Sequence, residues 1–146
     1  SNNGANIALS IPADGDYVFV FDASNTDNAS VSMFAAGMFG ETPIYVRGTM
    51  NGWSTDDQLS FDGSHVYSAI LSLTPGNYEF KIANEDWSLV DLGAGQDGNQ
   101  IELGKPLTLA PVGGDIGIAI DTAGNYRFEL RGPSTDAPQV IVTPVE

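Results

Sequence analysis

Short alternations of apolar and polar residues, broken repeatedly by glycine or proline, run through almost the whole sequence. Such alternation places every second side chain on one face of an extended strand, which is typical of a half-buried sheet. No stretch carries apolar residues at i, i+3, i+4 and i+7 for long enough to predict a helix of three turns. Because 17 glycines and 8 prolines supply turns, the pattern predicts an all-β chain folded as an antiparallel β-sandwich.

Twelve segments show this alternation or a short apolar run between turn residues. They are residues 6–11, 16–22, 30–34, 43–48, 66–73, 77–84, 86–90, 99–103, 107–109, 116–121, 125–131 and 139–143. Residues 31–39 are also apolar enough for a short helix, but Gly37 and the brevity of the run favour a strand followed by a linker.

The acidic composition excludes two classes of partner. Five Lys and Arg against nineteen Asp and Glu give a formal net charge of −14, whereas nucleic acids and anionic membrane surfaces select basic patches. With 42% hydrophobic residues among 146, the chain can still form one sizeable core. The absence of cysteine excludes disulfides, zinc-thiolate sites and thiol nucleophiles, and we expect no cofactor.

No apolar run is long enough to span a bilayer, since the longest is YVFVF at residues 17–21. The first ten residues lack the basic and apolar regions of a signal peptide, so we expect none and interpret Ser1 as a cut point. These features leave the compartment open, because a chain without cysteine suits both the cytosol and a secreted bacterial protein without disulfides.

Two segments, 11–31 and 120–140, align without gaps at an offset of 109 positions. The seven identities are Ile11/Ile120, Gly15/Gly124, Tyr17/Tyr126, Phe19/Phe128, Thr26/Thr135, Asp27/Asp136 and Val31/Val140. Similar hairpins can share turn residues without being repeats, but we favour a repeat. Residues 1–38 are then the closing strands of a preceding repeat or an N-terminal extension, and residues 39–146 form a complete unit of a modular protein.

Two segments share a recognisable order of elements, PIYVRGTMNGW at residues 43–53 and GNYEFKIANEDWS at residues 76–88. A strand ends in glycine, the loop N-G-W follows, and later G-x-Y-x-F-K precedes a turn and a second tryptophan. This order resembles the starch- and glycogen-binding modules of carbohydrate-binding module family 48, which include N-terminal modules of bacterial pullulanases. The resemblance covers roughly residues 42–103 and implies an immunoglobulin-like (E-set) β-sandwich.

In that family the α-glucan rests on two tryptophans, while a lysine and an asparagine hydrogen-bond sugar hydroxyls. The positions that match by motif are Trp53, Lys81, Trp87 and Asn99. The loop at residues 91–98 (DLGAGQDG) departs from the family pattern in length and composition. The motif match at Asn99, which follows this loop, is therefore weaker than the match at the two tryptophans. Carboxylates of that loop, Asp91 or Asp97, could also contact a sugar.

The resemblance implies a non-catalytic carbohydrate-binding module for α-1,4- and α-1,6-glucans such as starch, glycogen and pullulan. It would target an attached glycoside hydrolase, a pullulanase or amylase of the family 13 type, to its polysaccharide, beside covalently linked neighbouring modules. The expected location is outside a bacterium or on its surface. The alternative is a structural immunoglobulin-like spacer in a bacterial surface or secreted protein, with both tryptophans buried.

The residues themselves favour binding on chemical grounds. An exposed indole offers an apolar face to the axial C–H bonds of a sugar, and a good aromatic contact contributes about 0.5–1.5 kcal/mol beyond burial. Trp53 and Trp87 have mostly polar neighbours, although both rings could instead plug the core or a loop. Alternation places Lys81 on the outer face of its strand, where it could donate to a hydroxyl or pair with an acidic residue.

Catalytic and metal sites have weaker support. Glycoside hydrolysis needs two carboxylates across a cleft, and a sandwich of this size has little room for one, so we expect no catalytic residue. The single histidine, His65 in DGSHVY, is interpreted as a turn residue. Residues 22–27 and 97–102 offer oxygen ligands for calcium, but neither has the spacing of an EF-hand. We favour solvated acidic turns and expect no metal.

Overall fold

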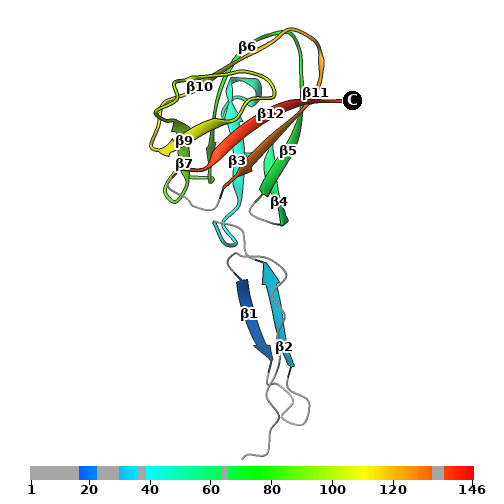
Figure 1. Ribbon diagram of the computed structural model, residues 1–146, viewed down its shortest axis with the longest axis vertical. Coiled ribbons are helices and arrows are strands. Elements are labelled where there is room, and N and C mark those ends of the chain that lie inside the picture. Colours follow the sequence, from blue (N-terminus) through cyan, green and yellow to red (C-terminus); the bar gives the residue numbers. More distant parts are fainter. Residues whose placement is uncertain (1–16, 23–29, 36–38, 64–65, 133–136) are drawn as a thin grey trace, which may run out of the picture.

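The computed structural model describes residues 17–22, 30–35, 39–63, 66–132 and 137–146 (Figure 1). Strands β1 (Tyr17–Asp22) and β2 (Ser30–Ala35) form an antiparallel sheet of their own. The remaining strands are β3 (Ile44–Gly48), β4 (Gln58–Gly63), β5 (Val66–Leu73), β6 (Gly76–Ala83), β7 (Asp91–Ala94), β8 (Gln100–Ile101), β9 (Leu107–Pro111), β10 (Ile116–Ile120), β11 (Gly124–Arg131) and β12 (Gln139–Val145). A short 3-10 helix, η1 (Thr49–Asn51), follows β3. Within the described ranges, no helix has the length and hydrophobicity of a membrane span.

Strands β3 to β12 form two layers joined at both edges. One layer contains β3, β6, β7, β8 and β10, and the other contains β5, β11 and β12. Strand β4 pairs first with β3 and then with β5, while β9 pairs first with β12 and then with β7. Because β3 also pairs with β6, the ladder of hydrogen bonds closes into a ring around the core. All pairings are antiparallel except that of β8 with β10.

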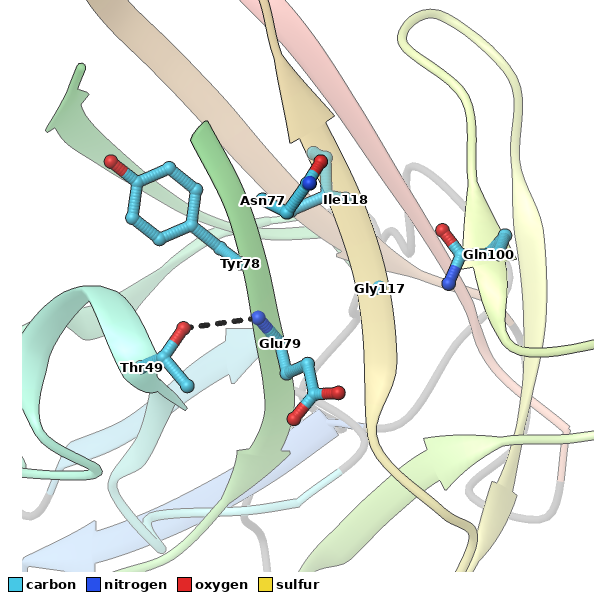
Figure 2. A pocket seen from close by; sticks show the side chains of 7 residues that line it. All are labelled: Thr49, Asn77, Tyr78, Glu79, Gln100, Gly117 and Ile118. Atoms are coloured by element: carbon cyan, nitrogen blue, oxygen red, sulfur yellow. Dashed lines mark hydrogen bonds between the residues drawn. The ribbon is translucent and has the colours of Figure 1, made fainter. Parts of the chain in front are cut away.

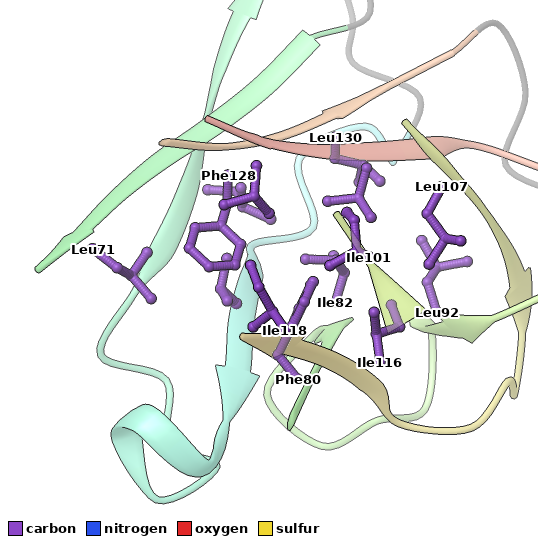
Figure 3. Close-up of a cluster of buried hydrophobic side chains, with 14 of the residues drawn as sticks. Leu71, Phe80, Ile82, Leu92, Ile101, Leu107, Ile116, Ile118, Phe128 and Leu130 are labelled. Atoms are coloured by element: carbon purple, nitrogen blue, oxygen red, sulfur yellow. The ribbon is translucent and has the colours of Figure 1, made fainter. Parts of the chain in front are cut away.

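Apolar side chains from both layers meet in one core (Figure 3). At its centre the fully buried rings of Phe80 and Phe128 meet edge to face, with their centroids 5.2 Å apart. Such a pair contributes about 0.5–1.5 kcal/mol beyond the burial of its area. Because alternate residues of β6 face inward, the residues between them face outward and are available for a site.

The predicted antiparallel all-β sandwich is confirmed. The predicted strand at residues 6–11 lies outside the described residues. The sequence does not predict β4, in which Leu59 is buried, and Asp62 and Gly63 are typical turn residues. This strand is specified by its position between β3 and β5, because it completes both ladders.

The predicted strand at residues 86–90 is wrong, since these residues form a turn and β7 begins after them. The buried side chain of Asn84 explains the difference. Its amide oxygen accepts hydrogen bonds from the backbone N–H of Leu89 at 3.2 Å and of Val90 at 3.0 Å. A side chain therefore takes amides that a strand would donate to its neighbour, and the chain turns outward at Trp87.

Gly48 lies where β3 passes very close to β6. A Cβ at this position would overlap the backbone oxygen of Glu79, and it would lie 2.6 Å from Met50 Sδ and 2.8 Å from Phe80 Cβ. A backbone oxygen held in a ladder cannot move aside as the tip of a flexible side chain can. The residue at this position must therefore be glycine for the ring of strands to close without strain.

We expect Gly48→Ala to lower the free energy of unfolding by about 1–3 kcal/mol, as overpacking does in other cores. The matched control is Gly124→Ala, because a Cβ there meets nothing within 4 Å. This control is expected to be neutral or slightly stabilising, since alanine restricts the unfolded chain. Urea denaturation followed by circular dichroism measures both, and equal midpoints for the two variants would contradict the prediction.

Candidate functional site

The two tryptophans lie on loops that leave neighbouring strands of the same layer. Trp53 follows η1 at the end of β3, and Trp87 lies in the turn between β6 and β7. Pairing of β3 with β6 brings both loops to one outer face, with Arg47 opposite Lys81 in the ladder. The two indole rings are half-buried, their centroids are 6.2 Å apart, and their planes are inclined by 46°. They form one tilted aromatic surface.

Two cations lie against the ring of Trp87. The guanidinium carbon of Arg47 is 4.2 Å from the ring centroid, and Lys81 Nζ is 5.5 Å from it. A cation in this position is attracted to the ring by about 0.5–2 kcal/mol. Lys81 also forms an ion pair with Asp91, in which both side chains are largely buried. The ammonium therefore has a fixed position beneath the aromatic surface.

Arg47 joins the two tryptophan loops through backbone carbonyls. Its Nε and Nη2 donate to the carbonyl oxygen of Trp53 at 2.8 and 2.5 Å. Its Nη1 donates to the carbonyls of Asn84 at 3.1 Å and Glu85 at 2.7 Å. The rigid fork of a guanidinium can reach three carbonyls in fixed directions, which the single nitrogen of a lysine cannot do. Arg47 therefore fixes the separation of the two loops.

Both tryptophans have a left-handed backbone conformation. The φ angle is 62° at Trp53 and 63° at Trp87. For a bulky residue such a conformation costs roughly 1–3 kcal/mol, and it persists only where the surroundings impose it. The strained backbone lowers the free energy of unfolding but places both rings on the same face. Strain of this kind is characteristic of functional positions.

Two asparagines hold these loops in place. The Asn51 side chain accepts from the N–H of Gly48 at 3.0 Å and donates to Asp57 at 2.8 Å. The Asn84 side chain accepts the amides that follow Trp87 and donates to Asp86 at 2.8 Å. Each loop is thus held by side-chain hydrogen bonds at its base and by Arg47 at its centre.

The carboxylate of Asp86 is a hydrogen-bond acceptor at the start of the Trp87 turn. It accepts from both the hydroxyl and the backbone N–H of Ser88, and from the amide of Asn84. Because these bonds stabilise the charged form, the Ser88 bonds first and Asn84 after them, the pKa of Asp86 is lowered from 3.8. The turn is therefore stabilised by the ionised carboxylate.

The structure brings three of the four predicted site residues together, namely Trp53, Trp87 and Lys81. It also forms the alternative considered for Lys81, a pair with an acidic residue. Asn99 lies elsewhere, exposed just before β8, where its backbone carbonyl accepts from the N–H of Gly117 at 2.7 Å. A role for the Asn99 side chain stays a prediction.

The sequence reasoning missed Arg47, although a signal for it exists. The alternation that places Lys81 outward on β6 also places Arg47 outward on β3, between the buried Val46 and Gly48. Only five Lys and Arg occur in the chain, so a cation inside the motif is as strong a candidate for the site as Lys81. What no pattern predicts is that its partners are backbone carbonyls.

Of the two segments that offer calcium ligands in the sequence, the structure describes the whole of residues 97–102. In the described ranges, no group of three or more His, Asp and Glu side chains is arranged to hold an ion. Asp97 accepts from the N–H of Thr108 at 3.3 Å, and Glu102 pairs with Lys105. His65 and most of residues 22–27 lie outside the described residues.

No protein-family model matches the sequence, and no curated protein matches it. A solved structure described as the ligand-induced structure of AmyP-SBD is similar in fold, with a TM-score of 0.59 and 21% sequence identity. The similarity covers 99% of this chain and 97% of that chain. At this identity the match establishes the shared fold.

We expect Arg47→Lys to separate the two loops while keeping the positive charge. Losing the charge-assisted hydrogen bonds should lower the free energy of unfolding by about 1.5–3 kcal/mol. The exciton signal of the paired indoles in circular dichroism should weaken as their separation and tilt become variable. The control is Arg127→Lys on the exposed face of β11, which should change neither quantity. An unchanged exciton signal in Arg47→Lys would show that the loops do not depend on the guanidinium.

The lowered pKa of Asp86 predicts a pH dependence of stability. A group whose pKa is lower in the folded state contributes stability above its unfolded pKa, and this contribution is lost as the pH falls through the folded pKa. Asp86→Asn should therefore be less stable than the parent protein at pH 7, with a difference that shrinks as the pH falls below 3.8. Thermal unfolding across this range measures it, with Asp121→Asn at an exposed turn as the control. A difference independent of pH would contradict the assignment.

Proposed function

We propose that this chain is a non-catalytic carbohydrate-binding module whose ligand is an α-glucan. The observation that carries the proposal is the pair of tilted indoles, half-buried and 6.2 Å apart, held above two cations. An indole presents an apolar face to sugar C–H bonds, and the Lys81 ammonium has N–H donors beyond the one that its pair with Asp91 requires, which a sugar hydroxyl can accept. The site thus meets both halves of a sugar's surface.

The tilt of the two rings favours a curved ligand over a flat one. An α-1,4-linked chain curves, so successive sugars present their faces in different directions, whereas a β-1,4-linked chain is straight. Ring planes inclined by 46° follow such a curve better than a coplanar row would. The rigid loops also reduce the entropy lost on binding, because the rings already have a fixed geometry.

Two similarities support the same class of ligand. The abbreviation SBD in the structurally similar AmyP-SBD stands for starch-binding domain, and the motifs around Trp53 and Trp87 resemble carbohydrate-binding module family 48. On this proposal residues 39–146 are the binding module, residues 1–38 belong to a preceding repeat or an extension, and Asn99 adds a hydrogen bond to the sugar. The parent would be a secreted bacterial α-glucan hydrolase such as a pullulanase or amylase, acting outside the cell.

The main alternative is a structural spacer with an immunoglobulin-like fold. In a spacer, tryptophans would stabilise the interior, and strained backbone around them would have no purpose. Here both rings lie outside the core, and both have a left-handed backbone that costs stability. This combination favours a binding surface.

Affinity electrophoresis tests the proposal. In native gels containing amylopectin the protein should be retarded, whereas a soluble cellulose derivative should leave its mobility unchanged. Trp87→Ala should abolish the retardation, because it removes half of the aromatic surface and the partner of both cations. Isothermal titration with maltooligosaccharides measures the same loss as at least a tenfold weaker affinity, which corresponds to about 1.4 kcal/mol.

The control is Phe61→Ala, which removes a partly exposed aromatic ring from the part of β4 that pairs with β5 of the other layer. It should bind as the parent protein does. Normal mobility of the parent protein in every α-glucan gel would contradict the proposed function. Equal losses in Trp87→Ala and Phe61→Ala would instead show that binding does not depend on the paired indoles.

A further inference from the structure

A second polar surface lies on the same outer face, one step further along β6. It is a depression of about 520 Å³, with Thr49 and Glu79 on one side, Gln100 on the other, and Gly117 at its floor. Figure 2 shows Glu79 and Gln100 projecting from β6 and β8 on the two sides of β10. The proposed function of the tryptophan pair does not account for this depression.

Strand β10 carries no side chain between Glu79 and Gln100, because the residue there is Gly117. Gly117 pairs with Glu79 on one side and with Gln100 on the other. A Cβ on Gly117 would overlap the amide group of Gln100, so this amide lies directly across the glycine. An ordinary strand residue here would fill the depression and displace the amide.

The groups around the depression suit a ligand rich in hydroxyls. The Thr49 hydroxyl oxygen accepts from the backbone N–H of Glu79 at 3.1 Å, which leaves its hydrogen free to donate. Glu79 takes part in none of the ion pairs between described residues, so its exposed carboxylate can accept. Gln100 offers both donors and an acceptor. Every sugar hydroxyl can both donate and accept a hydrogen bond. The depression offers it donors on Thr49 and Gln100 and acceptors on Glu79 and Gln100.

The depression and the aromatic surface share the outer face of β6. Glu79 and Lys81 are alternate residues of β6 and face the same way, about 7 Å apart by the rise of a strand. Lys81 lies under Trp87, and Thr49 begins the helix that leads to Trp53. A chain bound on the two indoles would therefore have to extend along β6 to enter the depression.

We propose that the depression formed by Thr49, Glu79, Gln100 and Gly117 is an additional sugar subsite. It would bind the unit of an α-glucan that follows those stacked on Trp53 and Trp87, by hydrogen bonds to its hydroxyls. This inference rests on the proposed function, since the aromatic pair anchors the chain. It predicts that affinity increases when a maltooligosaccharide becomes long enough to enter the subsite.

Gly117→Val tests the subsite without touching the aromatic pair. The new side chain would fill the depression, and the group it displaces is the end of a flexible side chain. Gly117 is buried beneath the Gln100 side chain, which can move aside, and valine has a high propensity for strands, so the fold should be retained. The matched control is Ser72→Val, which adds an exposed valine to β5 of the other layer.

Titration with maltooligosaccharides of increasing length gives a clear contrast. In the parent protein and in Ser72→Val, affinity should rise about tenfold at the length that reaches the subsite, as two ordinary hydrogen bonds would give. In Gly117→Val that rise should disappear, while affinity for the shortest bound oligosaccharide stays unchanged. Retention of the rise in Gly117→Val, or an equal loss at all lengths, would overturn the subsite.

The side-chain amide of Gln100 gives an independent readout. Its NMR signals should shift on addition of the long oligosaccharide and stay unchanged with the shortest one, which should shift only the two indole N–H signals. Indole shifts without a Gln100 shift at any length would overturn the subsite and leave the proposed function standing. Absence of both shifts at every length would contradict the proposed function, and the subsite with it.

Discussion

Strands β3 and β6 pair over four residues, and this ladder both closes the ring of strands and sets Arg47 opposite Lys81. The pairing is close because Gly48 has no side chain to hold the strands apart. Inward residues of the two strands enter the core, while their outward residues form the floor of the site. One stretch of backbone hydrogen bonds therefore determines the interior and the exposed surface at the same time.

The charge of the chain is distributed unevenly with respect to that floor. Two of its five Lys and Arg lie beneath the ring of Trp87, although the formal net charge is −14. Arg47 donates hydrogen bonds to backbone carbonyls, and Lys81 pairs with the carboxylate of Asp91. A neutral sugar is not repelled by the acidic residues on the rest of the surface. The net negative charge can therefore favour solubility without weakening sugar binding.

Much of this could be predicted from the sequence, and the failures have a common cause. Alternation gives the antiparallel sandwich and the outward direction of Lys81, and the motifs single out Trp53 and Trp87. Strand β4 and the turn before β7 were missed because partners distant in sequence determine them, paired strands in one case and the buried Asn84 in the other. The hydrogen bonds of Arg47 to backbone carbonyls depend on where the two tryptophan loops lie in the folded chain. The alternation of apolar and polar residues carries no information on those positions.

The left-handed backbone at both tryptophans has a consequence for how this domain changes over generations. At these two positions glycine relieves strain that any larger residue maintains. Selection for folding alone would therefore erode the aromatic pair, and only selection for what the rings contact would keep it. Variants obtained in a screen for heat resistance should accumulate replacements at these loops, and a library meant to preserve the surface must hold both codons fixed.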